Sequence, residues 1–199
     1  EDILIVTGGN HAGDFLRLLG NGREFGLKHL NYTYQEGESG IAGALVLAEH
    51  FSDYEKMVVI LGDNIIEGDI TPVVRDFKKQ KEGAKILLKE VPDPQRFGVA
   101  EIQDGKIVGI EEKPQIPKSN YAVIGIYMYD GKIFDIIRTL KPSGRGELEI
   151  TDVSNAYIRE GTMTYDFLKG WWSDAGTFES LHRVSNLIAQ GGANKRDLS

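Results

Sequence analysis

Short apolar runs alternate with helix-like patterns along the first half of the chain. Residues 3–6 (ILIV) and 57–61 (MVVIL) are continuous apolar runs, which are typical of strands buried on both faces. Thr71 and Pro72 open residues 71–80 as an N-cap and a first-turn proline, which predicts a helix there. Three strand–helix–strand units in series predict a mostly parallel α/β sheet with right-handed connections. The other strands of this half are expected at residues 30–35 and 84–91, and the other helices near 15–19 and at 41–50.

The pattern changes in the second half of the chain. Residues 98–114 hold two alternating runs around Asp104-Gly105, which predicts an antiparallel hairpin. We therefore expect residues 1–190 to form a single domain, with a Rossmann-like, mostly parallel sheet flanked by helices and an antiparallel hairpin insertion. Residues 191–199 are polar, and we expect them to be a frayed tail. Further strands are expected at 121–130 and 163–167, and further helices around 131–139, 149–160 and 177–190.

Composition narrows the function classes. The chain is 41% hydrophobic and 27% charged, as is ordinary for a soluble globular protein, and its net charge of -7 argues against nucleic-acid or anionic-membrane binding. It has no cysteine, which excludes disulfides, thiolate metal sites and cysteine nucleophiles. No apolar run approaches the roughly 20 residues of a membrane span. We expect a cytoplasmic protein that can bind phosphates only through backbone amides, local Lys or Arg side chains, or a metal ion.

Two aspartates follow predicted strands. Asp63 follows residues 57–61 after a single glycine, Gly62, and Asp174 follows residues 163–167. Ligands of open α/β sheets bind beyond the carboxyl ends of the strands, so the two acids can share one edge. Mg²⁺ is usually held by one or two carboxylates together with substrate phosphates. Asp63 could instead belong to a Gly-Asp-Asn turn, and Asp174 could cap the helix that begins near Thr177, so both interpretations stay open here.

Three other segments carry weaker evidence of ligand binding. Residues 35–44 (QEGESGIAGA) could offer backbone amides to an anion or a base edge, although the chain contains neither G-x-x-x-x-G-K-[ST] nor G-x-G-x-x-G. Glu112 and Lys113 could bind sugar hydroxyls and phosphate, or they could be an ordinary strand end stopped by Pro114. Arg145 could bind phosphate or simply be solvated.

Six segments together, in their order and spacing, form a recognisable pattern. The segments are VVILGDN, DPQRFGVAEI, GIEEKP, PKSNYAVIGIYMYD, GRGELEITDV and WWSDAGT. This pattern resembles the sugar-phosphate nucleotidylyltransferases from residue 1 to about residue 190, and most of all the members that transfer a thymidylyl group to glucose 1-phosphate. The resemblance implies the nucleotide-diphospho-sugar transferase fold. It also implies that dTTP and glucose 1-phosphate give dTDP-glucose and pyrophosphate by in-line attack, without a covalent enzyme intermediate.

The resemblance also assigns roles to residues. It implies that Asp63 and Asp174 hold Mg²⁺ and form the catalytic set together with Lys113. Gln35 and Gly40 are expected to contact the thymine, with Asp63 at the nucleotide phosphates. The expected partners are dTTP and glucose 1-phosphate, or dTDP-glucose, and the chain is expected to be a homo-oligomer without nucleic-acid or membrane partners. The residues expected to bind the sugar phosphate are Gly98, Glu112, Lys113, Val123, Arg145 and Glu147.

The chain departs from the family pattern in three respects. The family's first strand ends in a loop of the form G-G-x-G-T-R that is absent here, because Gly8-Gly9 follows what would be the second strand. Gly43 stands where the family often has Gln. The C-terminal helical extension of the allosteric members is also absent, so end-product inhibition through it is not expected. We expect that sequence precedes Glu1 and that these 199 residues are an inactive or impaired fragment.

Two other functions stay open. The chain could belong to a nucleotidylyltransferase that uses UTP or GTP and another sugar, which comparison of kcat/KM across nucleotides would reveal. It could also be a non-catalytic module that binds a sugar nucleotide. The missing loop favours that second hypothesis, whereas the presence of Asp63, Asp174 and Glu112-Lys113 opposes it. A dinucleotide-binding oxidoreductase is least favoured, since its glycine fingerprint is missing.

Overall fold

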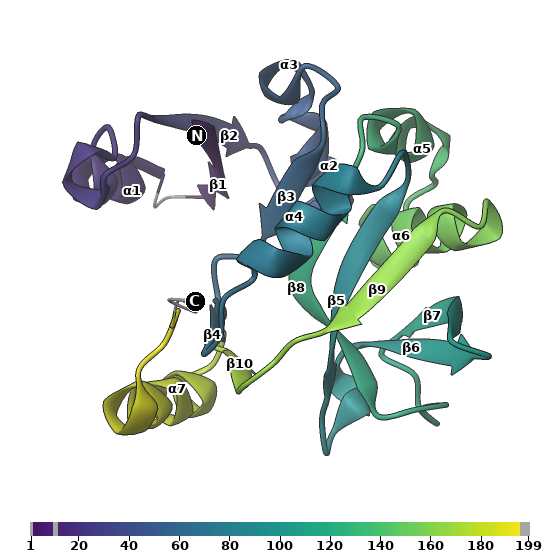
Figure 1. Ribbon diagram of the computed structural model, residues 1–199. Helices are drawn as coiled ribbons and strands as arrows, with labels where there is room; N and C mark the ends of the chain where they lie inside the picture. The colour runs from purple at the N-terminus through teal and green to yellow at the C-terminus, as the bar shows by residue number, and fades with distance from the viewer. Residues whose placement is uncertain (1, 10–11, 196–199) are drawn as a thin grey trace. The chain divides into compact units, whose positions relative to one another are not determined.

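The structure is a computed structural model that describes residues 2–9 and 12–195 (Figure 1). The chain divides into two compact units. The first contains Glu1–Glu55 and Gly131–Val153, and the second contains Lys56–Asp130 and Ser154–Ser199.

The first unit begins with a two-stranded parallel sheet. β1 (Asp2–Gly8) and β2 (His29–Gln35) pair in register over their whole length, and α1 (Ala12–Leu19) and the short 3₁₀ helix η2 (Arg23–Phe25) connect them. The strands and the helix are as predicted. The prediction that residues 3–6 are buried on both faces is wrong, because β1 has no fully buried residue. Within the described residues it pairs with β2 alone, and a two-stranded sheet leaves much of its surface open.

Three helices complete the first unit: α2 (Gly40–Val46), α3 (Glu49–Ser52) and α5 (Ile133–Thr139). α2 and α5 are in contact, and both carry buried apolar side chains. The single helix predicted at 41–50 is in fact two helices. The N–H groups of Leu47 and Ala48 bond to carbonyls three residues back, at 3.2 and 2.9 Å, and this tighter turn ends α2.

The second unit contains a six-stranded sheet. Its strands are β3 (Met57–Ile60), β5 (Ala84–Glu90), β6 (Gly98–Gln103), β7 (Lys106–Glu112), β8 (Tyr121–Tyr129) and β9 (Met163–Phe167). The strand path is β7-β6-β8-β5-β9, and β3 also pairs with β8. β5 and β9 are parallel, whereas β3, β5 and β6 each run antiparallel to β8. Four strands therefore share one direction, and β6 and β7 form the predicted hairpin.

Helices and one small strand pair complete the second unit. α6 (Ile150–Arg159) starts in the first unit and ends in the second. The prediction that Thr71 is an N-cap is wrong: Thr71 is the first helical residue, and its N–H donates to the carboxylate of Asp69 at 2.7 Å. The elements are α4 (Thr71–Lys79), α6 (Ile150–Arg159), α7 (Phe178–Gly191), the 3₁₀ helix η3 (Pro94–Arg96), and the antiparallel pair β4 (Asn64–Ile66) and β10 (Trp172–Asp174).

The core of the second unit lies on β5 and β8. The prediction that residues 57–61 are buried on both faces is wrong, because Val58 and Ile60 are 38% and 54% exposed. β3 has only β8 as a neighbour within the described residues, and these alternate side chains point away from the core. The fully buried side chains of the central strands include Ile86, Leu87 and Leu88 of β5 and Ile124, Ile126, Met128 and Tyr129 of β8.

One edge of β8 carries two different strands. β3 pairs with residues 126–129 of β8, and β6 pairs with Ala122 and Val123. β5 pairs with residues at both ends of β8 and therefore occupies the other edge of that strand. Gly125 lies between the two strands, and its carbonyl accepts a hydrogen bond from the Leu61 N–H at 2.8 Å. The chain that leaves β3 therefore turns aside at a fork in the sheet, immediately before Asp63.

The C-terminal segment lies along β4. The N–H groups of Asn194 and Lys195 donate to the carbonyls of Ile66 and Glu67, at 2.9 and 2.7 Å. Of the polar tail predicted at 191–199, residues 196–199 lie outside the described residues.

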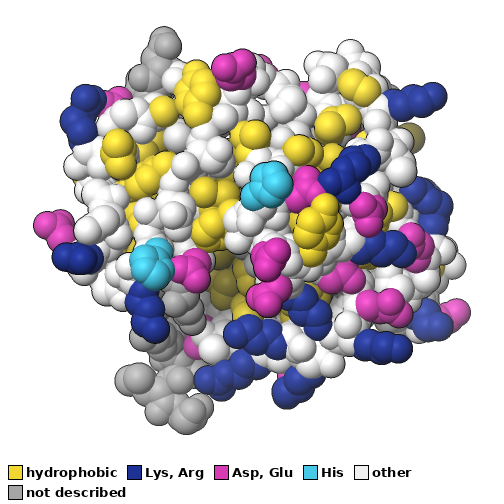
Figure 2. Space-filling model, turned by 90° about the horizontal axis from the view of Figure 1, so that it is seen from above, with side chains coloured by type: hydrophobic (Ala, Val, Ile, Leu, Met, Phe, Trp, Pro, Cys, Tyr) yellow, Lys and Arg dark blue, Asp and Glu magenta, His cyan; other side chains and the backbone are white. Residues whose placement is uncertain are grey.

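Acidic side chains lie beside basic ones over the face drawn in Figure 2, with apolar side chains between them. Among the described residues, no helix is both long enough and apolar enough to cross a membrane.

Candidate active site

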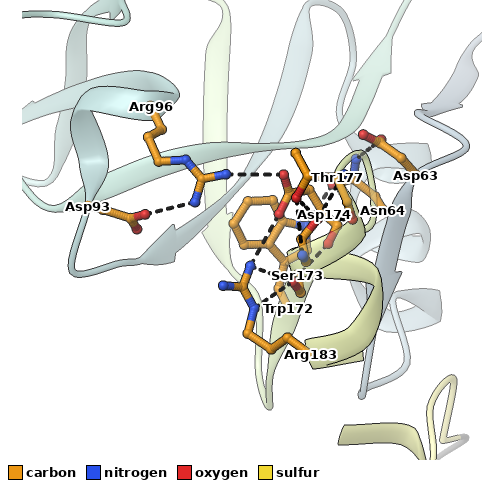
Figure 3. Close-up of polar contacts among 10 residues, drawn as sticks. Asp63, Asn64, Asp93, Arg96, Trp172, Ser173, Asp174, Thr177 and Arg183 are labelled. Carbon is orange, nitrogen blue, oxygen red and sulfur yellow. Dashed lines mark hydrogen bonds and ion pairs between the residues drawn. The ribbon is translucent and has the colours of Figure 1, made fainter. Parts of the chain in front are cut away.

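Asp63 and Asp174 come together at the fork in the second unit. β4 and β10 pair antiparallel, and Asn64 is the direct partner of Asp174. Such partners have Cα atoms about 4.5–5.5 Å apart. The Asp63 carbonyl also accepts a hydrogen bond from the N–H of Ala175 at 2.8 Å. The two predicted metal ligands, far apart in sequence, are thus neighbours in the structure (Figure 3).

Asn64 orients the carboxylate of Asp63. Its side-chain NH₂ donates to Asp63 Oδ1 at 2.8 Å. Its Oδ1 accepts from Trp172 Nε1 at 2.7 Å and from the Gly125 N–H at 3.0 Å. Asn64 therefore connects three strands, β4, β8 and β10. The sequence analysis treated it only as a turn residue, although an amide side chain directly after the candidate ligand was the feature that could have indicated this role.

Asp174 lies between two arginines. Its Oδ2 is 3.5 Å from Arg96 NH2, and its Oδ1 is 3.4 Å from Arg183 NH2. Asp93 binds Arg96 more closely, at 2.8 Å, and this hydrogen bond is the main reason that the pKa of Arg96 is raised. Arg183 also donates to Ser173 Oγ at 3.0 and 3.2 Å. Sequence analysis missed both arginines.

The alternative that Asp174 caps α7 is wrong. The N-cap of α7 is Thr177, whose hydroxyl accepts from the N–H of Ser180 at 3.1 Å. The Ser180 hydroxyl in turn accepts from the N–H of Thr177, also at 3.1 Å, so the two residues form a capping box. The Asp174 carboxylate is therefore not needed to cap the helix.

The residues at the fork fit a magnesium ion. A Cβ atom on Gly176 would lie 3.2 Å from Asp63 Oδ2, so the glycine leaves room beside that oxygen. The described residues contain no group of three or more His, Cys, Asp or Glu side chains that could hold a metal. Asp63 and Asp174 would thus supply two oxygen ligands, and the remaining positions would fall to substrate and water, as Mg²⁺ commonly requires.

Three of the predicted sugar-phosphate residues form a row across the sheet. Gly98 of β6 is the partner of Glu112 on β7 and of Val123 on β8. Lys113 follows at once, with a positive φ of 45° and its N–H bonded to the Phe97 carbonyl at 3.0 Å. The structure therefore brings these four residues together across β8, β6 and the end of β7, and β6 is the strand that shares the β8 edge with β3.

Buried Tyr127 links this row to the fork. Burial raises the pKa of Tyr127 well above its ordinary value, and the charges of Glu112 and then Asp63 raise it further. Both carboxylates therefore act on the same phenol from the second unit.

The remaining predicted residues belong to the first unit. Gln35 Nε2 donates to Ser39 Oγ at 2.7 Å and to the Gly40 carbonyl at 3.3 Å. Gly40 has a φ of +78°, and a Cβ atom there would lie 2.7 Å from the carbonyl of Leu148 and 3.1 Å from Glu147 Cβ. Only glycine fits this position, which keeps Gln35, Gly40 and Glu147 close together.

Arg145 is held by carboxylates of the same loop. Its NH2 group lies 2.9 Å from Glu149 Oε2 and 3.6 Å from Glu147 Oε2. A phosphate that binds Arg145 would therefore compete with Glu149, which the sequence analysis did not include. No clear indication of this pair was available in the sequence, because Arg145 and Glu149 lie in irregular backbone before α6, where the helical i,i+4 rule does not apply.

Comparison with known proteins identifies the class of this fold and site. A family model described as nucleotidyl transferase matches residues 1–191, and the chain belongs to that family. It is 39% identical over 192 residues to the glucose-1-phosphate thymidylyltransferase of Neisseria meningitidis serogroup A, covering 94% of this chain and 66% of that protein. It is 41% identical over 192 residues to the enzyme of the same name from Xanthomonas campestris pv. campestris strain B100, covering 94% of this chain and 65% of that protein.

Solved structures show the same likeness. A Bacillus anthracis protein assigned as a glucose-1-phosphate thymidylyltransferase, in complex with sucrose, is 56% identical with a TM-score of 0.88, covering 92% of this chain and 74% of that one. A UDP-glucose pyrophosphorylase complexed with UDP-glucose is 25% identical with a TM-score of 0.81, covering 96% of this chain and 81% of that one. The predicted fold class is therefore confirmed. The chain spans 65–66% of the length of the two thymidylyltransferases from Neisseria and Xanthomonas.

Proposed function

We propose that this chain carries the metal and sugar-phosphate sites of an enzyme that transfers a thymidylyl group from dTTP to glucose 1-phosphate. One observation carries the proposal: the β4–β10 pairing places Asp63 beside Asp174 at a fork in the sheet. The names of the relatives from Neisseria and Xanthomonas support this choice of substrates. The cytoplasmic location and the homo-oligomeric state expected from the sequence stay predictions.

The proposed reaction needs charge neutralisation and positioning more than proton transfer. A phosphate oxygen of glucose 1-phosphate forms a bond to the α-phosphorus of dTTP, the bond from that phosphorus to the bridging oxygen breaks, and pyrophosphate leaves. When bound, Mg²⁺ would neutralise phosphate charge, held by Asp63 and Asp174. Lys113 would bind the sugar phosphate as a fixed positive charge, and Glu112 would accept hydrogen bonds from sugar hydroxyls.

The residues of the first unit would bind the base. Gln35 can offer an amide donor and an acceptor to the thymine, and its bonds to Ser39 and Gly40 restrict its orientation. Buried polar contacts of this kind discriminate strongly between bases, because a wrong base leaves them unpaired. We therefore expect dTTP to be preferred over UTP and GTP in kcat/KM. A preference for UTP or GTP would support the alternative nucleotidylyltransferase.

The 199-residue chain itself can test the proposal, although it contains no G-x-G-T-R loop. We expect it to release little pyrophosphate from dTTP, glucose 1-phosphate and Mg²⁺, yet to bind dTDP-glucose in calorimetry. Rapid pyrophosphate release would contradict the expected impairment while supporting the function. A chain that neither turns over nor binds dTDP-glucose would contradict the proposed function. If this chain binds dTDP-glucose and longer versions of the protein also release no pyrophosphate, the hypothesis of a non-catalytic binding module would be supported.

Metal binding gives a separate test of the two aspartates. Asp63→Asn and Asp174→Asn should each weaken Mn²⁺ binding at least about tenfold, since each removes one of two charged ligands. Asp104→Asn is the matched control, because this exposed hairpin-turn residue undergoes the same chemical change and Asn accepts its positive φ of 49°. Equal Mn²⁺ affinity in all three variants would refute the metal assignment.

A further inference from the structure

Arg96 and Arg183 reach Asp174 from different elements of the second unit. Arg96 ends η3 and Arg183 lies on α7. Figure 3 shows the two guanidinium groups on either side of the Asp174 carboxylate. Neither arginine has a role in the proposed reaction, although both lie beside a candidate metal ligand.

The distances show that each arginine is fixed by another partner. Arg96 lies 2.8 Å from Asp93 and 3.5 Å from Asp174. Arg183 lies 3.0 Å from Ser173 Oγ and 3.4 Å from Asp174. Charge-assisted hydrogen bonds normally measure about 2.7–2.9 Å, so both contacts to Asp174 are long. Asp93 and Ser173 thus hold the two guanidinium groups, while charge attraction draws them toward Asp174.

Exposure shows that these contacts can be exchanged. The side chains of Arg96 and Arg183 are 41% and 49% exposed, whereas that of Asp174 is 18% exposed. Ion pairs of exposed arginines are weak, so little is lost when a guanidinium group turns to another anion. The planar guanidinium group also matches phosphate oxygens well.

We propose that Arg96 and Arg183 are exchangeable counter-charges of Asp174, which pair with it in the absence of a cation and bind phosphate oxygens once a metal–nucleotide complex arrives. This inference rests on the proposed function. Two positive charges beside Asp174 disfavour a free divalent cation at that carboxylate. The same two charges favour a cation that brings its own phosphates. The site thereby selects the metal–polyphosphate complex over the metal alone.

Opposite changes in two affinities test the proposal on the 199-residue chain. Arg183→Gln should bind Mn²⁺ roughly 3- to 10-fold more tightly than wild type without nucleotide, because a nearby positive charge is gone. In EDTA, the same variant should bind pyrophosphate more weakly by a similar factor. Arg96→Gln should show the same two changes, and Arg183→Lys, which keeps the charge, should retain wild-type Mn²⁺ affinity within about twofold. Electron paramagnetic resonance measures free Mn²⁺, and calorimetry measures pyrophosphate binding.

Arg159→Gln is the control for net charge, because Arg159 is an exposed residue at the end of α6 and its loss removes the same charge from the second unit. It should change neither affinity. A merely structural role for Arg183 would lower both affinities together and would overturn the proposal. An unchanged Mn²⁺ affinity in both Arg96→Gln and Arg183→Gln would also overturn the proposal. The absence of Mn²⁺ binding by both variants would overturn it as well. Failure to bind dTDP-glucose would count against the proposed function and would leave these Mn²⁺ and pyrophosphate results standing.

Discussion

Gly125 is the position where one added methyl group should disturb the candidate site most directly. A Cβ atom there would lie 2.5 Å from Asn64 Nδ2 and 2.8 Å from both Asn64 Cγ and Leu61 Cγ. The N–H of Gly125 also donates to Asn64 Oδ1. Because Trp172 Nε1 bonds to the same oxygen, Asn64 cannot move aside without losing hydrogen bonds. We therefore expect Gly125→Ala to displace Asn64 and loosen the fork.

The cost follows from these contacts. Overpacking a well-packed site costs about 1–3 kcal/mol, and the loss of one hydrogen bond costs about 0.5–1.5 kcal/mol. We expect Gly125→Ala to lower the free energy of unfolding by about 2–3 kcal/mol. The free energy of unfolding falls by about 2 kcal/mol per molar urea, so the urea concentration at the midpoint of unfolding should fall by about 1–1.5 M.

Gly109 provides the matched control. It lies in β7 of the same sheet without a positive φ, and a Cβ atom there would meet no other atom within 4 Å. Gly109→Ala should therefore be neutral or stabilise by up to about 1 kcal/mol, because alanine reduces the entropy of the unfolded chain.

Tryptophan fluorescence in urea measures the effect in the correct unit, because both tryptophans, Trp171 and Trp172, belong to the second unit. Mn²⁺ affinity should also fall in Gly125→Ala, since Asn64 no longer orients Asp63. Equal urea midpoints for Gly125→Ala and Gly109→Ala would refute the steric argument.

Two further predictions concern stability. Lys195 and then the Trp171 N–H bond to the carboxylate of Glu67 and hold its pKa below the ordinary 4.5. This stabilisation exists above the unfolded-state pKa and is lost as the pH falls through the lower folded-state pKa. The urea midpoint of the wild type should therefore exceed that of Glu67→Gln at neutral pH, and the two midpoints should converge in acid. The buried Tyr157 hydroxyl donates to Asp130 at 2.7 Å, so Tyr157→Phe should destabilise by about 1–3 kcal/mol in urea. Tyr165→Phe is the control, because Tyr165 is half-buried and its hydroxyl makes a long, exposed hydrogen bond to the Gly105 carbonyl at 3.4 Å; a smaller loss for Tyr157→Phe than for Tyr165→Phe would contradict this.

Local features of the sequence predicted the elements of the fold. The Asp104-Gly105 hairpin follows from turn chemistry, since both residues have positive φ, 49° and 74°. The burial of a strand could not be predicted from its local sequence in the same way. The run 57–61 is apolar throughout, yet Val58 and Ile60 are exposed, because burial depends on which neighbours a strand acquires. The break between α2 and α3 likewise lacks a Gly or Pro at Leu47-Ala48 that could have indicated it.

The candidate site shows the same division. Asp63 and Asp174 were predicted because each follows a strand, and strand ends are where open sheets bind ligands. Arg96 and Arg183 could not be predicted, since their proximity to Asp174 depends on how η3 and α7 pack, which no motif spacing encodes. Asn64 is an intermediate case, because its position was evident but its bond to Trp172, 108 residues away, was not.

The departure at Gly43 has a physical explanation within the first unit. A Cβ atom at this position would lie 2.7 Å from Ser39 Cβ and would overlap the Ser39 hydroxyl, so the Gln expected from the family cannot stand beside Ser39 in this arrangement. Gln35 uses that same hydroxyl as an acceptor at 2.7 Å. Glycine at 43 therefore makes room for the serine that restrains Gln35. Because Ser39 bonds directly to Gln35, the base-binding role proposed for Gln35 does not require a side chain at position 43.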